Sequence, residues 1–138
     1  MPLFANTKEL GVRSFILKVV NNNCSEVRRL MEGPRVERRV TLVLPVWVVP
    51  CKKREALVDA AFTAVTKEFA STGVAVVLDR ARGLDEVLLG FPWEGEIKWV
   101  RATAKHLSPL GGGFYQVGFR LTAIARPTDH PEIKSLTL

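Results

Sequence analysis

Apolar residues after residue 40 gather in six segments, and each segment has a length typical of a β-strand. Their β-branched and aromatic content favours strands over helices. The segments are residues 40–49, 61–69, 74–80, 84–91, 95–107 and 114–124. Six short strands at near-regular spacing, joined by hairpins and sharing one apolar face, predict a mainly β fold: a small antiparallel barrel or sandwich.

Alternation within the segments predicts which side chains face the core. Residues 114–124 alternate cleanly, with one face formed by Tyr115, Val117, Phe119, Leu121 and Ala123 and the other by Gln116, Gly118, Arg120 and Thr122. In residues 95–107 the polar positions change from even to odd numbers near Val100, which predicts a β-bulge. Pro45 lies inside the first segment and predicts an edge strand or a bulge there.

Glycine-containing segments predict two hairpin turns. Ser71-Thr72-Gly73 joins two strands, with glycine supplying backbone freedom. Gly111 to Gly113 join the last two strands; their spacing does not match a phosphate-binding GxGxxG loop, and no helix follows. Residues 51–59 form a charged connector.

The N-terminal part is harder to assign. "FILKVV" (residues 15–20) fits either a strand or one face of a helix. Further on, Asn23 and Ser25 are candidate N-caps of a short helix that Gly33-Pro34 ends. We therefore expect an N-terminal extension with a short helix over residues 1–34, a barrel over residues 35–125, and a surface tail with a short helical turn over residues 126–138.

Composition favours an anionic partner. Twenty Lys and Arg residues against fourteen Asp and Glu residues give a net charge of +6 and a pI of about 9.7. Cys24 and Cys51 show no metal-binding spacing and are interpreted as free thiols. Apolar runs reach only about ten residues, half of a membrane span, and no signal peptide is recognisable, so we expect a cytoplasmic protein.

Catalytic patterns are absent from the sequence. The two imidazoles, His106 and His130, are interpreted as a solvated residue at a strand end and a surface residue of the tail. No HExxH, CxxC or nucleophile-elbow pattern occurs. The sequence predicts a protein that is not an enzyme and has no cofactor or metal.

Three arginines precede the first strand: Arg35, Arg38 and Arg39 in "GPRVERRV". Arg35 and Arg39 form an RxxxR pair on a segment that Gly33-Pro34 separates from the preceding helix. A guanidinium group pairs bidentately with phosphate and stacks on flat rings. The segment is therefore either an anion-binding arm or a solvated linker.

The segments "RVERRVTLVLPVWV", "VTKEFASTGVAVVLD", "GEIKWVRA" and "YQVGFRL", in this order, resemble a PilZ domain, the bacterial receptor module for cyclic di-GMP. The resemblance covers about residues 35–125 and implies a six-stranded barrel of the split-barrel type. It also implies that Arg35 and Arg39 hold the phosphates and stack on guanine, with Arg38 as a further cation.

The second motif of that family, [D/N]xSxxG, is altered here to Glu68, Ala70 and Gly73. Glu68 retains a carboxylate that can accept from the guanine N–H edge, whereas Ala70 lacks the hydroxyl. Ser71 would point to the opposite face of an extended segment. One lost hydrogen bond of about 0.5–3 kcal/mol predicts binding weakened by about two- to a hundredfold.

Three functions remain open. The first is a non-enzymatic cyclic di-GMP receptor that orders its arginine arm and signals to a protein partner. The second is a degenerate PilZ domain that acts as a ligand-independent protein-interaction module, for which Phe91 and Trp93, beside Pro92, are candidate exposed residues. The third, single-stranded nucleic-acid binding, is disfavoured because aromatic and basic residues do not interleave along one strand face.

Overall fold

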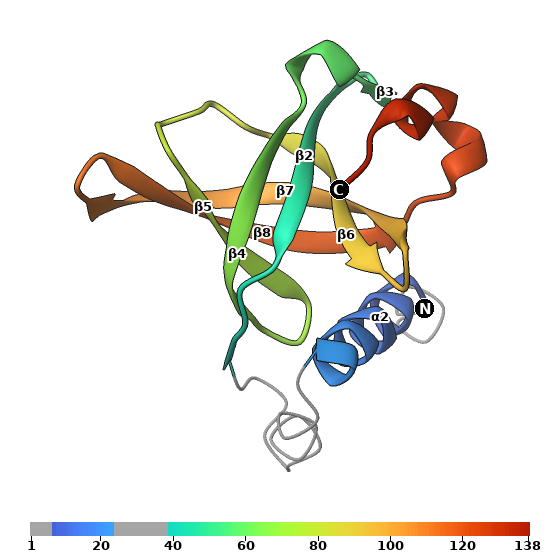
Figure 1. Cartoon of the computed structure of the whole chain (residues 1–138), viewed down its shortest axis with the longest axis horizontal. Helices are drawn as coiled ribbons and strands as arrows, with labels where there is room; N and C mark the ends of the chain where they lie inside the picture. The colour runs from blue at the N-terminus through green and yellow to red at the C-terminus, as the bar shows by residue number, and fades with distance from the viewer. Residues whose placement is uncertain (1–6, 24–38) are drawn as a thin grey trace.

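The computed structural model describes residues 7–23 and 39–138, which form one α-helix and eight strands. In chain order these are α2 (Thr7–Asn23), β1 (Val40–Thr41), β2 (Pro45–Lys52), β3 (Glu55–Ala56), β4 (Phe62–Phe69), β5 (Gly73–Leu78), β6 (Glu86–Trp93), β7 (Glu96–Gly111) and β8 (Phe114–Ile124). Three 3-10 helices, η1 (Val58–Ala60), η2 (Pro127–Asp129) and η3 (Pro131–Ser135), complete the described elements. The arrangement is drawn in Figure 1.

Six of the strands close into an antiparallel barrel, as the sequence predicted. The sheet order is β1-β4-β5-β8-β7-β6-β2-β3, and an additional pairing of β2 with β4 closes the ring. The short strands β1 and β3 lie outside the ring as partners of β4 and β2. Closure removes the free edges that an open sheet of this size would expose.

Helix α2 packs against the barrel core and resolves the ambiguous N-terminal segment. Its buried residues are Val12, Phe15, Ile16 and Val19, which recur at the i, i+3, i+4, i+7 spacing of one helix face. Phe15 contacts Phe91 at 5.4 Å and stacks on Trp93 at 5.5 Å between ring centroids. The predicted helix over residues 23–32 lies outside the described residues.

These contacts overturn the expectation that Phe91 and Trp93 are exposed in a loop. Both belong to β6, Phe91 is completely buried and Trp93 is partly buried. The strand continues through Pro92, as its unbroken register with β7 from Glu86 to Trp93 shows. A protein-interaction role cannot be based on these two aromatic residues.

Pro45 does not mark an edge, which is a second correction. The segment 40–49 divides into β1 and β2, and Pro45 is the first residue of β2, between β4 and β6. Proline is tolerated at the first position of a strand. At the break, buried Thr66 accepts a hydrogen bond from the Leu44 N–H (2.8 Å) and donates one to the Leu42 carbonyl (2.6 Å).

Most residues of the tail over residues 126–138 are exposed, and the tail also covers one outer face of the barrel. Ile133 is 1% exposed and packs in a second apolar cluster with Val49, Leu88 and Trp99. The indole Nε1–H of Trp47 donates to the carbonyl of Thr137 at 2.9 Å. The expected helical turn is confirmed as η2 and η3. The tail packs on the barrel because the strands beneath it present apolar side chains outward.

His130 is also buried, at 4% exposure, so its interpretation as a surface residue was wrong. Its Nε2 lies 3.3 Å from a guanidinium nitrogen of Arg101, and its Nδ1 lies 3.5 Å from the Glu132 carboxylate. His106 is exposed as expected, but it lies within β7, which continues to Gly111.

The pattern change near Val100 has a different cause from the predicted bulge. A register shift lies between Arg101 and Ala102, but the extra residue is Thr122 on β8, and β7 pairs regularly with β6 there. Outward side chains of β7 are apolar at Trp99, which the tail covers, and polar at Arg101 and beyond. The outward side of β7 thus changes from an apolar contact with the tail at Trp99 to a polar contact at Arg101, whose guanidinium lies 3.3 Å from His130.

Candidate functional site

A groove of about 660 Å³ runs over the outer face of β4, β5, β8 and β7. This volume lies within the usual range for small-molecule sites, about 300–1,000 Å³. The lining includes four of the six site residues predicted from the sequence: Arg39, Glu68, Ala70 and Gly73. Arg35 and Arg38 lie outside the described residues.

Strand register arranges the centre of the groove as one row across the sheet. Glu68 pairs with Ala75, Ala75 with Gly118, and Gly118 with His106. The neighbouring inward residues of β5 and β8, such as Val76 and Phe119, belong to the core, so this row faces outward. Its two middle positions are small and form a floor between larger side chains at each end.

A β-bulge in β4 points Glu68 toward the groove. The register with β5 shifts between Thr66 and Glu68, which leaves Lys67 as the extra residue. Thr66 and Phe69 are both buried, although a regular strand would place them on opposite faces. Glu68 consequently lies on the outer face, and Lys67 donates a hydrogen bond to Gln116 at 3.0 Å.

Arg39 and Glu68, from the two motifs, form an ion pair with 3.1 Å between a guanidinium nitrogen and a carboxylate oxygen. Glu68 pairs with Thr41, so the arginine just before β1 lies next to it. The side chains are 72% and 24% exposed, respectively. Exposed pairs of this kind contribute about 0–1 kcal/mol, so a ligand can displace or share this contact at little cost.

The turn between β4 and β5 forms one end of the groove. The Ala70 N–H donates to the Gly73 carbonyl, and the Leu121 N–H donates to the Thr72 carbonyl, both at 2.9 Å. A Cβ at Gly73 would lie 2.8 Å from the Phe119 carbonyl oxygen. Glycine is therefore required by the close approach of β8, and Gly73 is not among the described residues with positive φ, so the expected reason was wrong.

Ser71 lies closer to the groove than the sequence predicted. The expectation that it points away assumed an extended segment, but Ala70, Ser71 and Thr72 lie in the bend between the strands. Both Ser71 and Thr72 line the groove together with Ala70. Two hydroxyl groups are thus available beside the position where the family motif has serine.

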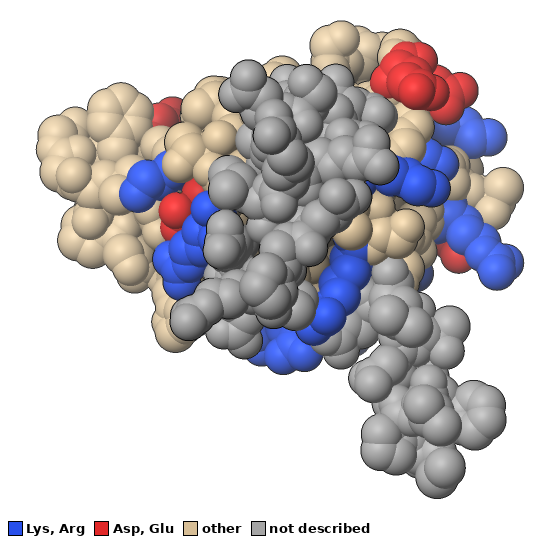
Figure 2. Space-filling model, turned by 90° about the horizontal axis from the view of Figure 1, so that it is seen from below, with Lys and Arg blue, Asp and Glu red and all other residues tan. Residues whose placement is uncertain are grey.

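Positive charge dominates the groove. Among the described residues, its lining contains Arg13, Arg39, Lys105 and Arg120, against one carboxylate, that of Glu68. Figure 2 shows a face of the molecule on which Lys and Arg side chains are more widespread than Asp and Glu side chains. Such a lining favours an anionic ligand.

Several lining residues were not predicted as site residues. These are Arg13 from α2, Lys105, His106 and Ser108 from β7, and Gln116, Gly118 and Arg120 from β8. Alternation did place the three β8 residues on the outer face. Their proximity to Glu68 depends on strand register, which the sequence pattern did not supply.

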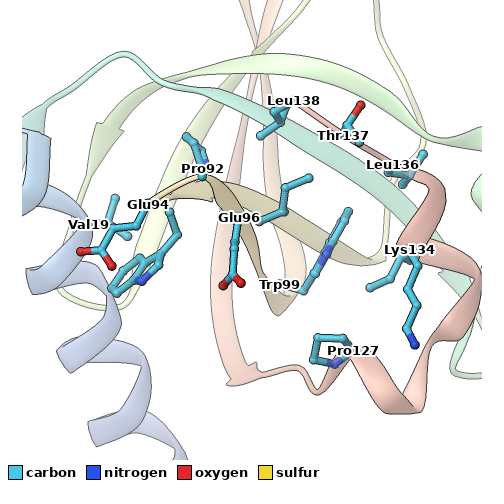
Figure 3. Close-up of a pocket in the computed structure, with 14 residues that line it drawn as sticks. Val19, Pro92, Glu94, Glu96, Trp99, Pro127, Lys134, Leu136, Thr137 and Leu138 are labelled. Atoms are coloured by element: carbon cyan, nitrogen blue, oxygen red, sulfur yellow. The ribbon is translucent and has the colours of Figure 1, made fainter.

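A second, larger cleft of about 850 Å³ lies between α2, the β6–β7 hairpin and the tail. Figure 3 shows Trp99, Pro127 and Leu136 around it, with Glu94 and Glu96 on the hairpin side and Lys134 on the tail. None of the predicted site residues that the structure describes lines this cleft. Its chemistry is mainly apolar and aromatic.

Within residues 7–23 and 39–138, no group of three or more His, Cys, Asp or Glu residues is positioned to hold a metal ion. Cys51 is a free cysteine, and Cys24 lies outside the described residues. Burial raises the pKa of the Cys51 thiol, and the nearby Arg101 guanidinium offsets this only in part. The same ranges contain no helix that is both long and apolar enough to cross a membrane.

Comparison with known proteins supports the fold. No protein-family model and no curated protein matches the sequence. The chain is similar to the solved structure of the Bacillus subtilis inhibitor of motility MotI/DgrA, with a TM-score of 0.51 and 16% identity over 70% of this chain and 46% of that chain. It also matches MrkH, described as a c-di-GMP-dependent transcription regulatory factor, with a TM-score of 0.44 and 12% identity over 69% and 46% of the chains.

The chain thus spans less than half the length of either matched structure. At this level of identity the likeness concerns the fold, and the barrel is PilZ-like, in agreement with the resemblance found in the sequence.

Proposed function

We propose that this chain is a non-enzymatic receptor for cyclic di-GMP. The observation that carries the proposal is the convergence of Arg39, Glu68, Ala70 and Gly73, from two motifs about thirty residues apart, on one cationic groove. The PilZ-like fold supports the same assignment.

The chemistry of the groove suits a cyclic dinucleotide. Two phosphate groups complement the arginine and lysine side chains. The Glu68 carboxylate can accept hydrogen bonds from the N–H edge of guanine, and Arg39 can stack on a base while it contacts phosphate. Arg35 and Arg38 complete the phosphate contacts in this proposal.

Ala70 weakens binding without abolishing it. The hydroxyl that the family motif supplies at this position is missing, while Ser71 and Thr72 line the same groove. We therefore expect the affinity for cyclic di-GMP to be only about two- to tenfold lower than with the serine present, which is the loss for one neutral hydrogen bond.

The signal passes to a protein partner through the arginine arm. A segment that closes over a dianionic ligand presents a changed surface, which is how binding is converted into recognition. Hydrogen exchange measures this directly: cyclic di-GMP protects residues 30–40 in the native chain, and Arg35→Ala or Arg39→Ala abolishes the protection. Equal protection in the variants would contradict the arm mechanism.

Calorimetric titration with cyclic di-GMP at moderate salt tests the receptor proposal, with the linear GMP dinucleotide as control. Saturable heat with the cyclic ligand and a weaker response with the linear one is the expected result. Absence of binding at millimolar cyclic di-GMP would overturn the proposal.

A ligand-independent protein-interaction module is the second candidate, now on different residues. Leu107, Leu110 and Phe114 of the β7–β8 hairpin are 45%, 43% and 51% exposed. Figure 1 shows this hairpin projecting beyond the barrel. Failure of the calorimetric test, with the fold intact, would favour this alternative.

A further inference from the structure

The motif residues occupy only one side of the groove, and the opposite side belongs to β7. Glu68 and His106 stand at the two ends of the row that crosses Ala75 and Gly118. Three strand spacings separate the ends, about 14 Å of backbone. Neither motif of the sequence includes a residue on β7.

The floor between the two ends is formed by small residues. A Cβ added to Gly118 would meet no atom within 4 Å, and Ala75 beside it carries only a methyl group and is 8% exposed. The half of the floor next to β7 therefore leaves room for a flat ligand. Gln116 and Ser108 pair in the adjacent row and flank this path.

A bulge in β7 turns two consecutive side chains toward the path. The register with β8 shifts between Ala104 and His106, so Lys105 is the extra residue. Adjacent residues of a regular strand point to opposite faces, but Lys105 and His106 both line the groove. Bulges frequently re-aim side chains at binding sites.

The charges that face His106 come from every element around the groove. They are Arg13 of α2, Arg39 before β1, Glu68 of β4, Lys105 of β7 and Arg120 of β8. The one carboxylate is engaged by Arg39. The phosphates of an incoming dianion would favour a positive charge on the imidazole.

We propose that the ligand site extends across the sheet to β7, where His106 contacts a phosphate of the bound dinucleotide and takes up a proton from the buffer as the ligand binds. This inference rests on the proposed cyclic di-GMP function. Lys105 contributes a permanent charge to the same contact. Affinity for the ligand then increases as the pH falls, because the protonated imidazole is the form that binds the phosphate.

Calorimetry of cyclic di-GMP binding in Pipes and in Tris, at the same pH near 7, measures the protons exchanged, because the two buffers differ in ionisation heat and neither supplies a phosphate that competes for the groove. The native chain should take up a fraction of one proton, and its Kd should be about tenfold lower at pH 6 than at pH 8. His106→Gln, at an exposed position, should abolish both effects. Lys105→Gln is the matched control: it should weaken binding but retain the proton uptake.

The possible outcomes distinguish failure of the His106 proposal from failure of the proposed receptor function. Binding without proton uptake, or with the same uptake in His106→Gln, would overturn the role of His106 and leave the receptor proposal standing. Absence of any cyclic di-GMP binding would overturn the receptor proposal and the inference with it. Ring resonances of His106 that move on titration with the ligand, and are missing in His106→Gln, provide an independent check.

Discussion

The two outer faces of the barrel differ in what covers them. On β2, β6 and the first half of β7, outward side chains such as Val49, Leu88 and Trp99 are apolar, and the C-terminal tail buries them. On β4, β5, β8 and the second half of β7, outward residues such as Ala75, Gly118, Lys105 and Arg120 are small or cationic, and they line a groove. One closed sheet therefore has a structural outer face and a face available for a ligand.

This difference shows that the outward side chains of a single strand can be apolar where the tail covers them and polar where solvent reaches them. Strand β7 takes part in both faces: Trp99 is 5% exposed under the tail, whereas Lys105 and His106 are exposed. Substitutions on the covered face should affect folding, and those on the open face should affect binding.

The largest effect is expected on the covered face. Trp99→Ala should lower the free energy of unfolding by about 3–5 kcal/mol, because it removes a large side chain from beneath the tail. Chemical denaturation measures this, with Leu138→Ala, half-exposed on the same tail, as a control that changes stability by about 0.5 kcal/mol or less. A loss below about 1 kcal/mol for Trp99→Ala would show that the tail cluster does not stabilise the fold.

On the open face, Arg39→Ala should weaken cyclic di-GMP binding by about ten- to a hundredfold, since a hydrogen bond to a charged group contributes about 1.5–3 kcal/mol. Stability should change little because the Arg39–Glu68 pair is exposed. Lys52→Ala, an exposed cation at the end of β2, controls for net charge in the same titration. Equal weakening by both variants would mean that overall charge, and not this contact, drives binding.

Substitution of two glycines of the groove should distinguish an effect on fold stability from an effect on ligand binding. Gly73→Ala should destabilise the fold by about 1–3 kcal/mol, because its Cβ would lie 2.8 Å from the Phe119 carbonyl oxygen. Gly118→Ala has open space around its Cβ and should leave stability unchanged while it obstructs the floor. Denaturation and calorimetry on both variants test this; unchanged ligand affinity in Gly118→Ala would place the ligand elsewhere.

The smallest effect concerns the altered motif. Ala70→Ser should strengthen cyclic di-GMP binding by about two- to tenfold, the contribution of one neutral hydrogen bond. Calorimetry of the variant beside the native chain measures it, and Ser71→Ala is the matched control for the neighbouring hydroxyl. If Ser71→Ala weakens cyclic di-GMP binding and Ala70→Ser has no effect on it, Ser71 is the residue that replaces the missing serine.

Local pattern determined much of the fold. Alternation in residues 114–124 named the core face of β8 correctly from Val117 to Leu121, since Val117, Phe119 and Leu121 are buried. For Ala123 it was wrong, because the bulge at Thr122 pairs Ala123 with outward Arg101. The hairpins at Ser71-Thr72-Gly73 and at Gly111 to Gly113 are confirmed by the antiparallel pairs that they join. Such features depend on residues near one another in sequence, where side-chain period and turn chemistry act directly.

Tertiary structure decided what depends on distant segments. The sequence predicted the two motifs as elements of one site, and the barrel brings Arg39 and Glu68 within 3.1 Å. It did not predict the row that joins Glu68 to His106, because register is set by pairing between strands and by bulges at Lys67 and Lys105.

Coverage by the tail was equally beyond local pattern. The change of polar positions near Val100 was visible in the sequence, but the burial of the outward side chain of Trp99 depends on the tail, more than twenty residues further along the chain. The sequence by itself indicated which segments after residue 40 are strands and named a cationic motif that could bind an anion. The closed barrel determined which outward faces remain open, because burial is a property of whatever packs on a strand and not of the strand alone.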